Sequence, residues 1–95
     1  MTIEELRKEL EKIISELTAS GFDAINSGTT EKLETLGASA GELGMKEGKR
    51  LIENLSGVIM AIQKGGSKAE SGNIRLTALD FYVKKLSGTE NIEEL

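Results

Sequence analysis

Carboxylates are the side chains of this sequence best suited to chemistry, and they are dense near its start. Glu4, Glu5, Glu9 and Glu11 lie within about two helical turns of one another. Two carboxylates held close together perform general acid–base catalysis or bind a cation. Here they alternate with lysine and arginine, and they lack the aspartate-rich loop spacing of a calcium site. We therefore interpret them as the solvated face of a helix.

The composition also excludes several other kinds of catalytic site. The sequence has no cysteine and no histidine, which excludes disulfides, thiolate zinc sites and the commonest general base. Ser39 thus has no histidine to activate it as a nucleophile. The run from Gly65 to Lys68 lacks the glycine–lysine spacing and the preceding strand of a phosphate-binding loop. We predict a protein that is not an enzyme and holds no metal or cofactor.

The elements that carry these side chains are predicted to be helices. The 95 residues suffice for one domain, and hydrophobic residues make up 38% against 3% aromatics, so the core is aliphatic. There is no proline, and leucines recur with helical periodicity. We expect one helical domain over residues 1–88 and an acidic, frayed tail over residues 89–95, with Gly88 ending the last helix.

Local signals delimit the first two helices. Thr2 and Glu5 form a capping-box pattern, and this helix either ends near Ser20–Gly21 or continues, bent, to Gly28. Thr29 or Thr30 is expected to cap the second helix, and Gly44 to end it in a left-handed conformation. The residues expected to point inward are Ile3, Leu6, Leu10, Ile13, Ile14 and Leu17, then Leu33, Leu36, Ala40 and Leu43.

The third helix is expected from Met45 or Lys46 to Lys64, with Gly65–Gly66 closing it. The fourth is expected to begin with Ser67 and Glu70 or, alternatively, with Asn73 as its cap. Leu51, Leu55, Val58 and Ile62 are predicted inward, with Ile52 and Ile59 beside them, followed by Leu76, Leu79, Val83 and Leu86, helped by Phe81 or Tyr82. Short links between four amphipathic helices predict an all-α fold, an antiparallel up-and-down four-helix bundle. The alternative is a three-helix arrangement completed by a second copy.

The second helix has an unusual outward face. Ala38 lies almost opposite its leucine stripe at 100° per residue. A solvated face is normally covered by long charged side chains, so a small residue there leaves room for another backbone. We predict a partner-binding surface made of Glu31, Glu34, Thr35, Gly37, Ala38, Gly41, Glu42 and Met45. Gly37 falls beside the core stripe, where it equally allows a close helix–helix approach.

The run from Glu34 to Met45 resembles the phosphoacceptor helix of histidine phosphotransfer (HPt) domains. The pattern of that family is His, variable, Leu, Lys, Gly, Ser, Ala, then variable residues followed by Leu-Gly. Leu36, Ser39, Ala40, Leu43 and Gly44 match it in register. The resemblance covers about a dozen residues and implies a four-helix module of bacterial phosphorelays.

The chain departs from the family pattern at the positions that carry its phosphotransfer chemistry. Glu34 stands at the position of the phosphorylated histidine, Gly37 at the usual lysine and Ala38 at the usual glycine. The resemblance therefore implies a pseudo-HPt domain that transfers no phosphate and binds a response-regulator receiver domain. Glu34 would place a permanent negative charge where the phosphorylated form carries one.

Charge narrows the choice of partners. With 12 basic and 16 acidic residues the net charge is −4, which argues against nucleic acid as a partner. No apolar run is long enough to span a membrane, and we expect a cytoplasmic protein. The one basic cluster, Lys46, Lys49 and Arg50, either meets an anionic partner or is solubilising. Two other functions stay open: a structural module that self-associates as a homodimer, and an adaptor that binds an amphipathic helix.

Overall fold

The all-α prediction is confirmed by a computed structural model, which describes residues 2–22, 27–66 and 69–93 as four helices without a strand among them. The helices are α1 (Ile3–Ser20), α2 (Ser27–Glu42), α3 (Lys46–Gln63) and α4 (Ala69–Glu93).

The start of α1 is fixed by the predicted capping box. The Glu5 amide donates to the Thr2 hydroxyl at 3.1 Å, and the Thr2 amide donates to a Glu5 carboxylate oxygen at 3.0 Å. These bonds satisfy amide groups that have no partner within the helix. At its other end α1 stops at Gly21, which has φ of 72°, so the shorter of the two predicted helices is observed.

Glycines also end α2 and α3, as predicted. Gly44 has φ of 77°, and the Met45 amide donates to the Ala40 carbonyl at 2.9 Å. Gly65 has φ of 78°, and the Gly66 amide donates to the Ala61 carbonyl at 2.8 Å. Both patterns are Schellman motifs, in which a left-handed glycine turns the chain back onto the last helical carbonyls.

The predicted start of α2 was wrong, and the later of the two starts predicted for α4 is excluded. Helix α2 begins at Ser27, ahead of both proposed caps, and Thr30 is buried within its first turn, where it packs into the bundle. Helix α4 begins at Ala69, so Asn73 lies inside the helix. Ser67, the other proposed cap of α4, lies outside the described residues.

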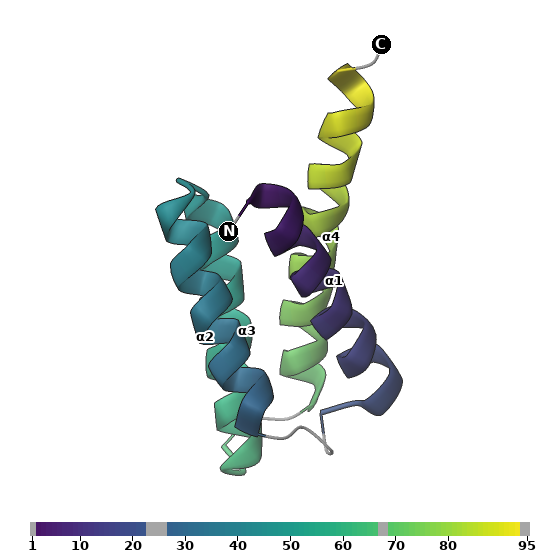
Figure 1. The fold of residues 1–95 in the computed structure, drawn as a ribbon. Coiled ribbons are helices and arrows are strands. Elements are labelled where there is room, and N and C mark those ends of the chain that lie inside the picture. Colours follow the sequence, from purple (N-terminus) through teal and green to yellow (C-terminus); the bar gives the residue numbers. More distant parts are fainter. Residues whose placement is uncertain (1, 23–26, 67–68, 94–95) are drawn as a thin grey trace.

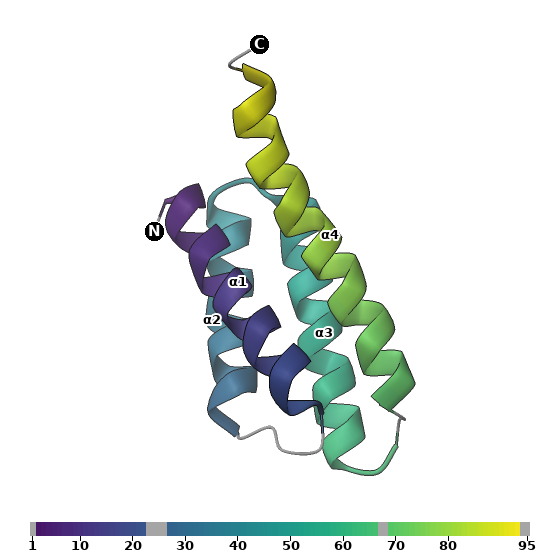
Figure 2. The ribbon, with the colours of Figure 1, turned by 90° about the vertical axis from the view of Figure 1, so that its right-hand side faces the viewer.

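The predicted end of α4 at Gly88 was also wrong. The helix continues through Gly88 to Glu93, so residues 89–93 are helical. Gly88 is not among the glycines with positive φ, and a glycine that keeps helical dihedrals does not stop a helix. In Figures 1 and 2 the last turns of α4 project beyond the other three helices.

The four helices form a closed cycle of contacts. Helix α1 packs against α2 and α4, and α3 packs against the same two helices more closely. In Figure 1, where the colours follow the sequence, the chain runs downward along α1, upward along α2, downward along α3 and upward along α4. Consecutive helices thus run in alternate directions, as the turned view in Figure 2 also shows. The aliphatic side chains between them form one core.

The core is the predicted one in α1, apart from Ile3, and in most of α2, but the centre of the buried face of α3 was misplaced. Ile52, Leu55 and Ile59 are fully buried, whereas Leu51, Val58 and Ile62 are only partly buried. Gly48 and Ser56 share the buried stripe. Gly48 lies under the Tyr82 ring of α4, and α3 turns its 48–52–55–59 face inward.

Smaller corrections concern single residues of the other helices. Ile3 and Phe81 are exposed, and Leu43 and Leu86 are only partly buried. The aromatic residue that packs inward on α4 is Tyr82, whose ring covers Gly48. The described residues of the core are Leu6, Leu10, Ile13, Ile14, Leu17, Phe22, Leu33, Leu36, Ala40, Ile52, Leu55, Ile59, Leu76, Leu79 and Val83.

Candidate functional site

The outward face of α2 is an open stripe with a small residue at its centre. Ala38 is exposed, as the helical periodicity indicated. The acidic and polar residues around it on the same face are exposed too: Glu31, Glu34, Thr35 and Glu42. Their spacing of three, four and seven residues places them along one side of the helix. A backbone approaching this stripe meets short side chains at its middle and carboxylates at its margins.

Three of the predicted surface residues take part in contacts within the bundle. Gly37 is buried, and a Cβ there would lie 3.5 Å from Ile52 Cγ2 and 3.6 Å from Glu53 Cγ, so it permits the close approach of α3. Gly41 is exposed but covered by Lys49, whose Cδ would lie 3.2 Å from a Cβ. Met45 is partly buried against the core. The open surface therefore contains fewer residues than the predicted partner-binding surface.

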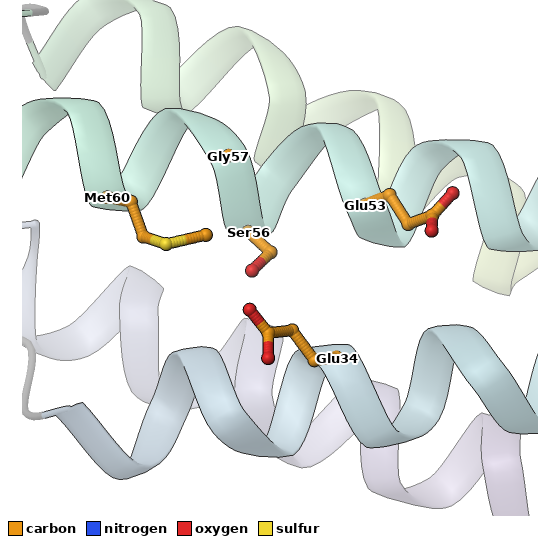
Figure 3. A pocket seen from close by; sticks show the side chains of 5 residues that line it. All are labelled: Glu34, Glu53, Ser56, Gly57 and Met60. Carbon is orange, nitrogen blue, oxygen red and sulfur yellow. The ribbon is translucent and has the colours of Figure 1, made fainter.

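A hollow of about 330 Å³ lies beside this stripe, between α2 and α3. Figure 3 shows the Glu34 carboxylate pointing from α2 toward the Ser56 hydroxyl on α3, with Met60 toward one end and Glu53 toward the other. The residues that line it are Glu34, Glu53, Ser56, Gly57 and Met60. Of these, only Glu34 was predicted. The available signal for the others was the Ser56–Gly57 pair, which stands between the apolar residues Leu55 and Val58.

Three carboxylates of α1, those of Glu4, Glu9 and Glu11, are engaged in ion pairs. Arg7 bridges Glu4 at 3.7 Å and Glu11 at 2.7 Å. Lys32 Nζ of α2 lies 2.7 Å from Glu9 Oε2. The hydrogen bond and the charge of that ammonium group lower the pKa of Glu9. These carboxylates carry charge that neighbouring cations neutralise, which does not suit a general acid.

The basic cluster at the start of α3 is divided among different contacts. Arg50 pairs with Glu47 one turn earlier, and this carboxylate raises the pKa of the guanidinium. Lys49 extends across Gly41 of α2, and Lys46 is exposed. The three side chains do not converge on one site.

No group of three or more metal-ligating side chains occurs in residues 2–22, 27–66 and 69–93. Among the same residues no helix combines the length and the apolarity needed to cross a bilayer. Comparison with protein-family models, curated proteins and solved structures finds no match to this chain.

Proposed function

We propose that this protein is a non-catalytic interaction module that binds a partner protein through the outward face of α2. The observation that carries the proposal is the exposed stripe of short and acidic side chains centred on Ala38. A helix face of this kind admits another helix or loop at short range and offers it carboxylates at the rim. Within the described part of the chain, nothing packs over Ala38.

The partner we propose is a response-regulator receiver domain, in keeping with the resemblance of residues 34–45 to the HPt phosphoacceptor helix. Support comes from Glu34, which is exposed on the proposed docking face and occupies the histidine position of the family pattern. Since the chain contains no histidine, it would occupy the receiver and compete with true phosphodonors without transferring phosphate. This role belongs to a bacterial two-component pathway and a cytoplasmic location.

The test is the substitution Ala38→Arg, with Ala19→Arg as its matched control. Ala19 is an exposed alanine on α1, so both variants add the same side chain to a solvated helix surface. Both are expected to keep the helical circular dichroism and the melting temperature. Only Ala38→Arg should abolish binding in titrations against the receiver domains of the source organism. Unaltered binding by this variant, or no binding by any of those receivers, would overturn the proposal.

A second candidate function rests on a different surface. Ile74 and Phe81 of α4 are exposed to 67% and 61%, and they lie seven residues apart on one side of the helix. Phe81, Leu51 and Ala78 border a hollow between α3 and α4, and Lys85 lies 4.8 Å from the Phe81 ring centre. An apolar strip bordered by charges suits self-association or an amphipathic helix.

Light scattering over a range of concentrations tests this second function. If α4 mediates self-association, the mass should rise with concentration in the wild type and in Ala38→Arg but not in Phe81→Glu. A concentration-independent monomer that also fails to bind an amphipathic helical peptide would contradict it.

A further inference from the structure

Ser56 is a buried polar group without a partner at the edge of the proposed docking face. Its exposure is 3%, and its hydroxyl oxygen makes no hydrogen bond to any described residue. Buried hydroxyls are usually hydrogen-bonded, because leaving one unsatisfied costs free energy. In Figure 3 this hydroxyl points into the hollow toward the Glu34 carboxylate. The position therefore favours a bound polar group that completes the bonding of Ser56.

The charge of the hollow indicates the sign of that group. Its two ionisable residues, Glu34 and Glu53, are both acidic. Neither makes an ion pair with another described residue. Lys49, one turn before Glu53, extends across Gly41 instead. By contrast, the hollow between α1 and α2 contains a carboxylate that Lys32 already neutralises. The α2–α3 hollow is thus an acceptor site with uncompensated negative charge.

We infer that this hollow receives an arginine side chain of the docked partner, its guanidinium bonded to Glu34 and Ser56. This inference rests on the proposed function, because it supplies the chemistry by which the α2 face recognises a protein. A guanidinium presents five N–H donors in a plane and pairs with a carboxylate through two of them. A third donor is then free for the Ser56 oxygen, which has two acceptor positions.

The remaining lining residues suit the rest of an arginine. Gly57 adds no side chain to the floor, and the Met60 thioether offers a polarisable apolar surface for the aliphatic stem. Glu53 adds a second negative charge, and its own stem lies against Gly37 of α2. A lysine would supply a point charge but not the planar set of donors that reaches both Glu34 and Ser56.

The probe is arginine acetylated at its amino group and amidated at its carboxyl group, added to the full chain labelled with nitrogen-15. We expect saturable shifts of the Glu34, Ser56 and Gly57 amide resonances, with a weak Kd on the order of tens of millimolar, because a solvent-facing ion pair alone contributes little to affinity. The same derivative of lysine should bind at least about threefold more weakly. The citrulline derivative, which keeps the shape of arginine without its charge, should produce no saturable shift.

Variants distinguish arginine binding in the hollow from general electrostatic attraction to the acidic protein. Glu34→Gln and Ser56→Ala should each weaken arginine binding at least about threefold, since each removes one of the two principal acceptors. Glu16→Gln removes the same charge from α1, and Ser39→Ala removes a hydroxyl from α2 outside the hollow. Both should bind arginine like the wild type. Equal binding of citrulline or lysine, or an equal effect of Glu16→Gln, would overturn the inference.

The outcome can be read separately from that of the docking proposal, because the arginine probe needs no partner. If the probe binds as expected but Ala38→Arg leaves receiver binding intact, the docking proposal alone fails. If Ala38→Arg abolishes receiver binding but the probe does not bind, the arginine inference alone fails.

Discussion

The ring of Phe22 lies directly against Gly72, joining the segment after α1 to the first turn of α4. A Cβ at position 72 would lie 2.9 Å from Cε1 and Cζ of that ring and 3.0 Å from Ile62 Cδ1. Phe22 is buried, so the ring cannot move into solvent without losing apolar contact. Gly72 is therefore the point at which the α1 end of the chain, α3 and α4 meet.

Three glycine-to-alanine variants should differ in sign because their surroundings differ. Gly57→Ala, where nothing lies within 4 Å, should stabilise the protein by about 0.5–1 kcal/mol through helix propensity. Gly72→Ala should destabilise it by about 1–3 kcal/mol through overpacking. Gly48→Ala should fall between them, since the half-buried Tyr82 ring that it meets at 3.0 Å has room to shift. Urea unfolding measures all three, and a uniform stabilisation would contradict the packing described.

Ser56→Ala is expected to stabilise the free protein. The variant removes a buried hydroxyl that makes no hydrogen bond, and relief of that penalty is worth about 1–3 kcal/mol. The expected result is a higher urea midpoint with an unchanged slope. Ser39→Ala, a half-buried serine outside the hollow, serves as the comparison. A loss of stability in Ser56→Ala would show that this hydroxyl is satisfied in the free protein.

The Glu9–Lys32 pair should make stability depend on acid pH. The hydrogen bond and charge of Lys32 hold the pKa of Glu9 below its ordinary value of 4.5. A lowered pKa means that the pair stabilises the fold fully above that ordinary value and ceases to do so as pH falls through the lowered one. Glu9→Gln should flatten this part of the profile of unfolding free energy against pH. Lys32→Gln removes the same pair, so a different response from the two variants would contradict the assignment.

At alkaline pH the stability of the fold should depend on the ionisation of Tyr82. Burial raises the pKa of its phenol above 10.0, and the charge of Glu47 adds to this, while the Gly48 backbone amide opposes it. Because the folded state holds this proton more tightly, the stabilisation is complete below the unfolded pKa and is lost as pH rises through the folded one. Tyr82 is the sole tyrosine, so absorbance follows its titration directly. Tyr82→Phe should remove the alkaline loss of stability.

Leu55 and Leu43 should differ in their contribution to stability. Leu55→Ala is expected to cost about 2–5 kcal/mol, because the side chain is fully buried. Leu43 lies beyond the last helical residue of α2 and is only partly buried, so Leu43→Ala should cost less than about 2 kcal/mol. Equal losses in urea unfolding would place Leu43 in the core, where its periodicity alone had assigned it.

Signals confined to a few neighbouring residues were sufficient to predict where several helices begin or end. The Thr2–Glu5 capping box and the turns at Gly44 and Gly65 depend on groups within six residues of one another, and the sequence displays all of those groups. The outward position of Ala38 likewise followed from the period of a single helix.

Features that depend on a second helix were not predictable in the same way. The buried face of α3 includes Gly48, which the Tyr82 ring of α4 covers, and no pattern within α3 reveals that contact. The hollow joins Glu34 to Ser56 across two helices, so its residues become neighbours only after packing. Gly88 was misleading because glycine permits a helix end without requiring one.

The short connection from Leu43 to Met45 bears on how the chain folds. Bringing α2 and α3 together closes a very small loop, and the entropic cost of loop closure rises with loop length. The close α2–α3 pair is thus kinetically favoured to assemble early, with the acidic hollow already formed within it. Helix α1, which also packs against α4 at the far end of the chain, completes its contacts only when the whole sequence is available. During synthesis the part of its leucine stripe that faces α4 therefore stays uncovered until the last helix emerges.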